Sequence, residues 1–242
     1  MQLVPSISIH DGRTARLIKG DFENEKVFDL SPLDVARQFE DAGIIAIHLV
    51  DLNGAEIGTI FNYPTLELIS GHTGLKINYT GGIQTDGDLL KAFEFGADSI
   101  TASTVSVYKP ELFKAWMISY GREKIMLGAD CLNQQIRVGG WLKKTQLDLF
   151  EHVAYYYDRG LKYIKTTDIS MEGRLEGPPF DLFKRLVANF PNLCIYARGG
   201  VRNMDDIKQL QDTGIFGVIF GSSFYEGRIT LNEISDFIKN NP

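Results

Sequence analysis

The chain has 242 residues, 44% of them hydrophobic and 23% charged, which is ordinary for a folded globular protein. Its formal net charge is -6 with acidic and basic residues interspersed, so no basic stripe indicates binding to nucleic acid. The two cysteines form no metal or disulfide pattern, and neither a leader peptide nor an apolar run of about 20 residues is evident, so we expect a cytoplasmic protein that does not associate with membranes.

Short apolar or β-branched runs alternate with amphipathic stretches along the chain. The runs predict strands at Leu3–Ile9, Ile45–Asp51, Leu75–Tyr79, Asp98–Ala102, Lys124–Asp130, Lys162–Thr167, Leu193–Ala197 and Phe216–Phe220. The stretches have apolar residues three and four positions apart. They predict helices at Leu33–Ala42, Tyr63–Ser70, Asp86–Phe95, Pro110–Ser119, Leu147–Arg159, Phe180–Ala188, Met204–Asp212 and Leu231–Lys239.

Eight strand–helix units of about 30 residues fit a closed (β/α)8 barrel better than a doubly wound open sheet. No linker, low-complexity tract or composition break divides the chain. We therefore expect a single α/β domain over residues 1–242 with the (β/α)8 TIM barrel fold.

Three pairs of landmarks recur along the chain with an offset of 118 or 117 positions. These pairs are Gly82 and Gly200, Gly96 and Gly214, and Asp51 and Asp168. A general likeness between βα units is the competing explanation, but it does not require a constant offset. The offset predicts a barrel built from two duplicated half-barrels of four units each.

Two glycine pairs follow the predicted third and seventh strands, in "YTGGIQTDGDLL" and "YARGGVRNMDDI". In a barrel these positions lie on the face where active sites are built. Glycine lets backbone N–H groups approach an oxyanion, although tight turns and helix caps are the alternative role. The candidate phosphate ligands at these pairs and after the fourth and eighth strands are Gly81, Gly82, Ser103, Thr104, Gly199, Gly200, Gly221 and Ser222. Two such sites on one mouth predict an elongated substrate with a phosphate at each end.

The chain resembles the ProFAR isomerase family of histidine biosynthesis in stretches that run nearly from end to end. They are "HDGRTARLIKGDF", "FEDAGIIAIHLVDLNGA", "GGIQTDGDL", "KIMLGAD", "GGW", "TTDISMEGRLEGPPF", "GGVRN" and "FYEGRITL". The "VDLNGA", "EGRLEGP" and "YEGRITL" segments favour the isomerase over the sister cyclase. The resemblance implies a duplicated barrel, phosphate sites at the glycine pairs, and neither a metal nor an organic cofactor. It also implies an aldose–ketose (Amadori) isomerisation of a bisphosphorylated ribosyl-aminoimidazole carboxamide.

This reaction needs one group that protonates the ribose ring oxygen and another that removes the proton from the adjacent carbon. In the family these groups are aspartates at the ends of strands 1 and 5. The strand 5 position is Asp130, whereas the strand 1 position is Ser8. A serine hydroxyl is un-ionised near pH 7 and cannot inherit the role of a carboxylate. Thr167 matches an active-site threonine of the family.

Other positions also depart from the family pattern. They are Thr80, Gln84, Ser103, Glu172, Arg174 and Arg198, where we expect Gly, Arg, Gly, Asp, a smaller residue and a small residue. Arg198 either clamps a phosphate bidentately or fills the space that a phosphate would occupy. We expect the second phosphate site, at Gly199 and Gly200, to be intact or strengthened and the first, at Gly81 and Gly82, to be eroded.

Five further residues are candidates for substrate contact. Trp141 lies in a loop that in the family closes over substrate, and it either contacts substrate or anchors that loop. Arg16 and Lys19 lie in the first loop, where they meet a phosphate or remain exposed surface charges. Asp51 and Asp168 end equivalent strands, and each either orients ligand or hydrogen-bonds to backbone.

Strand alternation turns Lys165 towards the barrel interior together with Thr167. A desolvated lysine can form a Schiff base with a carbonyl substrate, whereas pairing with an acid is the structural alternative. We expect His48 in the core or between helices. His10 and Asp11 are candidates for a displaced base.

Three functions are compatible with these residues. The first is the isomerase, with some replacement for the strand 1 carboxylate. The second is a divergent paralogue that converts another sugar phosphate through Lys165, and the third is a binder that has lost catalysis. The extent of the match favours the first, with a small sugar phosphate as the partner molecule and a monomeric protein.

Overall fold

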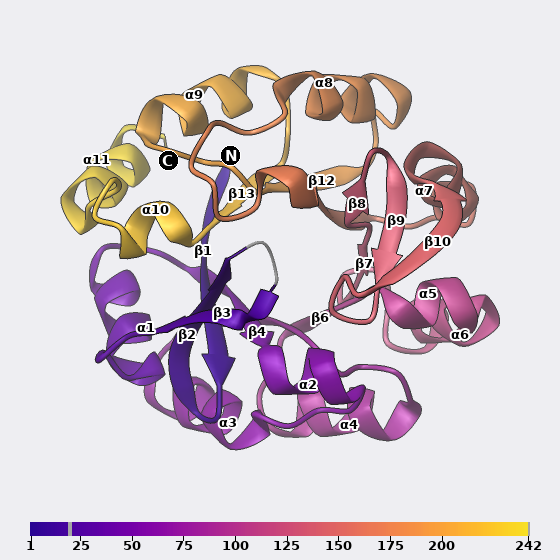
Figure 1. Ribbon diagram of the computed structural model, residues 1–242, viewed down its shortest axis with the longest axis horizontal. Coiled ribbons are helices and arrows are strands. Elements are labelled where there is room, and N and C mark those ends of the chain that lie inside the picture. Colours follow the sequence, from indigo (N-terminus) through magenta and orange to yellow (C-terminus); the bar gives the residue numbers. More distant parts are fainter. Residues whose placement is uncertain (19–20, 242) are drawn as a thin grey trace.

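The computed structural model describes residues 1–18 and 21–241, so Lys19, a predicted phosphate contact, lies outside the described residues. Within them, eight parallel strands close into a barrel and each is followed by a helix (Figure 1). In barrel order the strands are β1 (Gln2–His10), β4 (Ala46–Asp51), β5 (Lys76–Thr80), β6 (Ser99–Ala102), β7 (Ile125–Gly128), β11 (Tyr163–Thr167), β12 (Cys194–Arg198) and β13 (Gly217–Phe220). Because β1 pairs with both β4 and β13, the ring is closed. The predicted (β/α)8 barrel is confirmed.

Eight longer helices of the described chain cover the outside of the barrel. They are α1 (Pro32–Asp41), α3 (Tyr63–His72), α4 (Asp86–Glu94), α6 (Pro110–Ser119), α7 (Leu149–Tyr157), α8 (Phe180–Asn189), α9 (Met204–Asp212) and α11 (Leu231–Asn240). Shorter segments follow four strands: α2 (Leu52–Ile57), α5 (Thr104–Tyr108), η1 (Ile169–Met171) and α10 (Ser222–Tyr225). Over the described residues, no helix combines the length and apolar character needed to cross a membrane.

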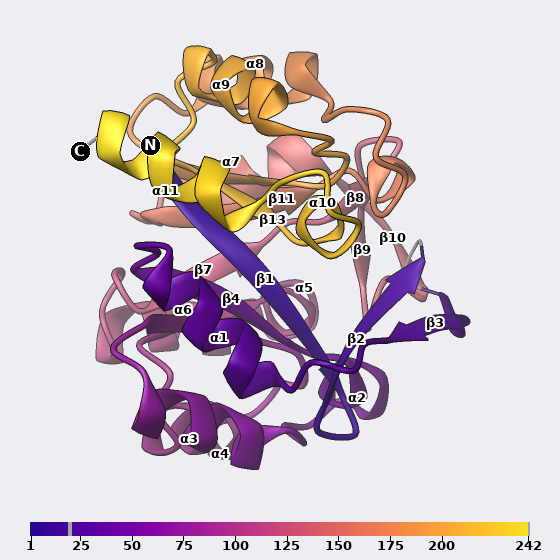
Figure 2. The ribbon, with the colours of Figure 1, turned by 90° about the vertical axis from the view of Figure 1, so that its left-hand side faces the viewer.

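Two antiparallel additions stand at the carboxyl end of the barrel strands, and the sequence patterns did not predict them. One is the hairpin of β2 (Arg13–Ile18) and β3 (Asp21–Val27), and the other is the sheet of β8 (Cys131–Leu132), β9 (Gln135–Val138) and β10 (Lys143–Asp148). Figure 2 shows both additions at one end of the barrel and the chain termini at the other. The helix predicted from Leu147 begins at Leu149 instead, because Asp148 ends β10 and caps α7 with its carboxylate.

The main hydrophobic core lies between the strands and the helices, where outward-facing residues such as Ile7, Leu49 and Leu127 are fully buried. A separate apolar cluster faces the barrel interior and consists of Val4, Met126, Tyr196 and Ile219. This division leaves the inward positions near the carboxyl ends of the strands available for polar side chains.

The barrel interior also contains a polar layer around His48. Nδ1 of His48 lies 2.8 Å from Oδ1 of Asn78, and Oγ1 of Thr101 donates to the same oxygen across 2.7 Å. Burial lowers the pKa of His48 well below its ordinary value, and the nearby cations Lys165 and Arg198 lower it further. His48 is therefore a neutral residue of the barrel interior. Of the two predicted locations, the core is confirmed and the position between helices is not.

Candidate active site

A cavity with two lobes opens at the carboxyl ends of the barrel strands. The first lobe includes Gly81, Gly82, Ser103, Thr104, Asp130, Trp141 and Lys165 among its lining residues. The second lobe is lined by Gly199, Gly200, Gly221 and Ser222 among others. Four residues line both lobes and form their shared wall: Ser8, Arg16, Glu172 and Arg198. The structure thus brings most of the predicted site residues to one mouth.

The two glycine pairs have closely similar backbone conformations. Gly82 has a φ of +79° and Gly200 a φ of +80°, which is left-handed backbone that favours glycine. A Cβ at Gly82 would collide with the carbonyl of Thr59, and a Cβ at Gly200 would collide with the carbonyl of Gly177. Only glycine therefore fits either turn, and the backbone itself can face a ligand. The origin of the barrel from two half-barrels stays a prediction.

Ser103 and Thr104 occupy the first lobe without disturbing its floor. Ser103 fits where a glycine was expected because it packs against Gly128, which has no side chain to obstruct it. Oγ1 of Thr104 accepts a hydrogen bond from the backbone N–H of Gly139 across 3.0 Å. The lobe is thereby tied to the loop between β9 and β10, and a Cβ on Gly140 of that loop would lie 3.4 Å from the carbonyl oxygen of Ala55 on α2.

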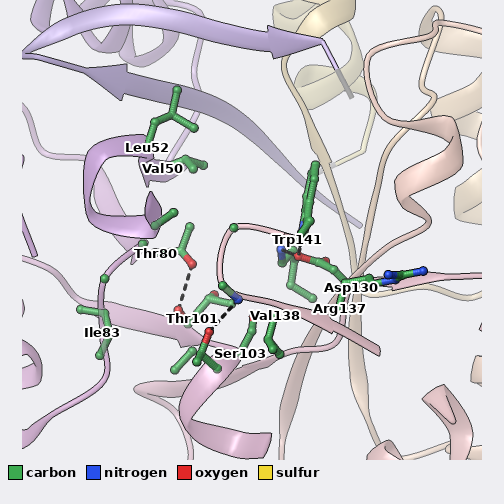
Figure 3. A pocket seen from close by; sticks show the side chains of 18 of the residues that line it. Val50, Leu52, Thr80, Ile83, Thr101, Ser103, Asp130, Arg137, Val138 and Trp141 are labelled. Carbon is green, nitrogen blue, oxygen red and sulfur yellow. Dashed lines mark hydrogen bonds and ion pairs between the residues drawn. The ribbon is translucent and has the colours of Figure 1, made fainter. Parts of the chain in front are cut away.

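Asp130 carries the carboxylate of the first lobe. Its Oδ2 accepts hydrogen bonds from Nε1 of Trp141 across 2.8 Å and from Nζ of Lys165 across 2.7 Å. Figure 3 shows Asp130 and Trp141 on one side of the pocket, with Val50, Leu52 and Thr80 on the other. Trp141 has a φ of +71°, so the loop presents its indole to the carboxylate with the backbone in the left-handed region. Trp141 therefore anchors its loop, which was one of the two roles considered for it, and it also lines the cavity.

Burial by itself would raise the pKa of Asp130, but Lys165, Arg198 and Trp141 outweigh it and hold that pKa below its ordinary value. Burial lowers the pKa of Lys165, and Arg198 acts in the same direction, while Asp130 opposes the shift. The two groups form an ion pair in which Nζ of Lys165 donates to the Asp130 carboxylate. Ser8, half-buried, lines the same lobe at the position that the family resemblance assigned to a strand 1 catalytic group.

Arg198 and Glu172 form the second ion pair of the mouth. NH2 of Arg198 donates to Oε1 of Glu172 across 2.9 Å, with the two side chains only 12% and 14% exposed. The guanidinium also lies 5.7 Å from the centre of the Trp141 ring. Arg198 thus neither fills the second lobe nor stands free for a phosphate. Arg16, which lines both lobes, donates from NH1 to Glu226 across 2.8 Å.

Asp51, predicted to contact substrate, does not line the cavity. Its carboxylate is fully buried and accepts hydrogen bonds from protein groups only: the backbone N–H groups of Gly54, Phe61 and Asn62, the Asn62 side chain, and the Tyr79 hydroxyl. The reason is alternation, because Asp51 has the same parity as the outward-facing Ile47 and Leu49. Of the two roles considered for Asp51, the structure therefore shows hydrogen bonding to backbone, which holds the following loop in place.

Asp168 and Thr167 are also absent from the cavity lining. Oδ1 of Asp168 accepts from the backbone N–H and the hydroxyl of Ser170, across 3.0 and 2.6 Å, and so caps η1. Thr167 is fully buried and packs beside Gly199. Thr167 is thus close to the second lobe without facing it.

The proposed displaced bases are likewise engaged elsewhere. Nδ1 of His10 pairs with Glu25 across 2.6 Å, and Oδ1 of Asp11 accepts from Asn53 across 2.8 Å. Neither residue lines a lobe. Conversely, sequence patterns missed several lining residues that come from the added strands and short helices, among them Leu17, Arg137 and Tyr225. Each segment that places them did carry a signal of a site: Arg16 on β2, the "GGW" motif after β9 and Ser222 on α10.

Comparison with known proteins gives matches over nearly the whole chain. Residues 2–230 match the family described as histidine biosynthesis protein. The 1-(5-phosphoribosyl)-5-((5-phosphoribosylamino)methylideneamino)imidazole-4-carboxamide isomerase of Flavobacterium psychrophilum is 40% identical over 240 residues, 99% of this chain and 100% of the relative. Isomerases of the same name are 43% identical in Bacteroides fragilis (98% of this chain, 100% of the relative) and in Cytophaga hutchinsonii (98% and 99%).

The matched range includes every barrel strand and every residue of the shared wall. Both ion pairs of the mouth also lie within it. This match, together with relatives of at least 40% identity along their full length, shows that the chain belongs to the histidine biosynthesis protein family.

Proposed function

We propose that this protein is an isomerase of the kind its relatives are named for. It converts a bisphosphorylated ribosyl-aminoimidazole carboxamide from an aminoaldose into an aminoketose. The observation that carries the proposal is the pairing of two glycine-floored lobes on one mouth with the buried carboxylate of Asp130. A substrate with a phosphoribosyl group at each end fits such a mouth, because each end can occupy one lobe.

Each lobe offers backbone and hydroxyl groups to one phosphate. In the first lobe these groups belong to Gly81, Gly82, Ser103 and Thr104. This lobe has Gln84 where the family resemblance leads us to expect an arginine. Gly199, Gly200, Gly221 and Ser222 serve the second. Arg16 and Arg198 line both lobes from the shared wall, where each is paired with a glutamate, Glu226 and Glu172 respectively. Because the first lobe has Gln84 where a cation was expected, we expect the second lobe to hold its phosphate more tightly than the first.

Asp130 is the proton acceptor in this proposal. Its pKa lies below the ordinary value, so the carboxylate is ionised at neutral pH. Oδ2 is occupied by Trp141 and Lys165, whereas Oδ1 is buried and has no hydrogen-bond partner among the described residues. Because Asp130 lines the first lobe, we assign to its carboxylate the removal of the proton from the carbon next to the anomeric centre of a bound aldose.

We further propose that the protein works in the cytoplasm as a monomer, on a small molecule and without nucleic acid or membrane. The net charge of -6 supports the absence of a nucleic-acid partner, because it disfavours binding to polyanions.

Turnover of the authentic aminoaldose by the purified protein, next to Asp130→Asn, tests the function. We expect the wild type to form the aminoketose and the variant to lose roughly 100- to 10,000-fold in kcat while it still binds substrate. Substrate binding by the wild type without turnover would favour the binder considered above. A gain of turnover in Ser8→Asp would then show that the strand 1 carboxylate was the missing group.

A further inference from the structure

The ion pair between Asp130 and Lys165 lies inside the barrel mouth. Nζ of Lys165 is 2.7 Å from Oδ2 of Asp130, and the two side chains are only 4% and 5% exposed. Both residues line the first lobe, and Ser8 lines it as well. A lysine so deeply buried is costly to keep unless its charge is compensated, and here one carboxylate compensates it.

Titratable groups from three other elements lie near this pair. Arg198 at the end of β12 and Glu172 after η1 carry opposite charges and are paired with each other. His48 on β4 is neutral. The local balance around Lys165 is therefore close to zero, and its ammonium is a better acid than that of a free lysine, because burial disfavours the charged form.

We propose that Lys165 is the proton donor and Asp130 the proton acceptor of one catalytic pair, which replaces the carboxylate that Ser8 lacks. This inference rests on the proposed isomerase function. The ring oxygen and the carbon that loses its proton are both bonded to the anomeric carbon. The two proton transfers are therefore separated by a single atom, which suits two groups in direct contact on one side of the substrate.

The protons and bonds balance along this route. Lys165 donates a proton to the ring oxygen, the bond from that oxygen to the anomeric carbon breaks, and an iminium forms. Asp130 removes the proton from the neighbouring carbon, which gives an enolamine. The enol hydroxyl then loses its proton and the former anomeric carbon gains one, which yields the aminoketose with no net change.

The contact between Nζ and Oδ2 lets the pair reset itself. After the two transfers the lysine is a neutral amine and the aspartate a neutral acid, and one proton passing along their hydrogen bond restores both. The pair has no net charge before and after this cycle, and its single negative charge between the two transfers faces the positive charge of the substrate iminium. A buried site favours such a sequence, since no step leaves an uncompensated charge away from water.

Replacement of Lys165 by arginine and by glutamine tests the assignment. Arginine keeps the positive charge but does not donate its proton at neutral pH. Glutamine has neither the positive charge nor an acidic proton. We expect both variants to bind the aminoaldose, and kcat to fall by roughly 100- to 10,000-fold. The matched control is Lys162→Gln on the residue just before β11, whose amine is exposed and paired with Glu123, and we expect it to keep wild-type turnover.

The pH profile of kcat provides a readout that a structural role of Lys165 would not change. We expect wild-type kcat to fall at high pH as the ammonium loses its proton, and this limb to vanish from the residual activity of the glutamine variant. A folded arginine variant with kcat within tenfold of the wild type would overturn the assignment, because a fixed charge would then suffice. Covalent capture of substrate on Lys165 by borohydride would also overturn it, because the lysine would be a nucleophile.

The outcomes separate this inference from the function on which it rests. If the wild type turns over and the arginine variant does as well, only the role of Lys165 fails. If the wild type binds the aminoaldose without any turnover, the isomerase function fails and the role of Lys165 falls with it. Should the glutamine variant not fold, the charge-conserving arginine variant decides the question.

Discussion

Nε1 of Trp141 donates a hydrogen bond to Oδ2 of Asp130 across 2.8 Å, so a loop residue is fastened to the carboxylate of the proposed reaction. The same oxygen accepts from Lys165, and together the two donors help keep Asp130 ionised in a buried place. The loop between β9 and β10 therefore lines the mouth and affects the charge state of Asp130 through one side chain.

Trp141→Phe removes this donor and keeps most of the ring. We expect kcat to fall roughly tenfold, since a hydrogen bond to a charged group contributes about 1.5–3 kcal/mol. Trp116→Phe is the matched control, because Nε1 of Trp116 donates to Asp86 across 2.6 Å outside the site. Steady-state kinetics measures kcat for both variants. If Trp141→Phe and Trp116→Phe lower kcat by the same factor, the proposed role of Trp141 is wrong.

Asp51→Asn and Asp168→Asn compare two aspartates at equivalent strand ends. Asp51 is fully buried and accepts five hydrogen bonds, whereas Asp168 uses one oxygen to cap a single turn. An asparagine at position 51 would place its NH2 group against the N–H and O–H donors that now bind the carboxylate. We therefore expect Asp51→Asn to lower the free energy of unfolding by about 3 kcal/mol. For Asp168→Asn we expect a loss of about 1 kcal/mol or less. Urea denaturation measures both, and equal losses would contradict the loop-holding role of Asp51.

Glu172→Gln removes the negative partner of Arg198. We expect the freed guanidinium to bind the substrate phosphate better and to lower KM roughly threefold with kcat almost unchanged. Glu176→Gln, at an exposed residue that pairs with Arg174, should leave both constants as they are. A higher KM in the Glu172 variant would instead mean that Glu172 contacts the substrate.

His152 makes the fold sensitive to acid. Burial lowers the pKa of His152 from 6.5 to about 4. Between these two pH values the imidazole is therefore protonated in the unfolded chain but neutral in the folded protein. Stability is therefore lost as pH falls from about 6.5 towards 4, by about 2 kcal/mol between pH 7 and pH 5.

His152→Gln keeps a polar partner for Ser106, which lies 3.1 Å from Nε2 of His152, and has no titrating ring. We expect its urea midpoint to shift less than that of the wild type between pH 7 and pH 5. An unchanged shift would assign the acid sensitivity to other groups, of which the buried neutral His48 is the first to test.

The barrel was predictable from the sequence because its signals are local. Apolar runs bounded by turns placed each of the eight strands within a few residues of its position, as for Ala46–Asp51. The glycine pairs were recognisable because only glycine tolerates their left-handed backbone at close approach. Alternation along β11 correctly turned Lys165 towards the barrel interior.

The added hairpins were not predictable in this way. The β10 segment "KKTQLD" is polar and resembles a loop or a helix start, and it forms a strand only because β9 lies beside it. The residues Leu17 and Arg137 reached the site through such pairing.

The sequence by itself determined which residues turn inward and where the backbone can bend, because both depend on neighbours along the chain. Only the tertiary structure decided which charges meet. Asp51 and Asp130 both end barrel strands, yet one holds backbone groups outside the barrel and the other lies 2.7 Å from a lysine inside it. Lys165 is 35 residues from Asp130 in sequence, and Arg198 is 26 from Glu172. Their contacts arise because closure of the barrel brings different strand ends to one mouth, a relation that no local pattern contains.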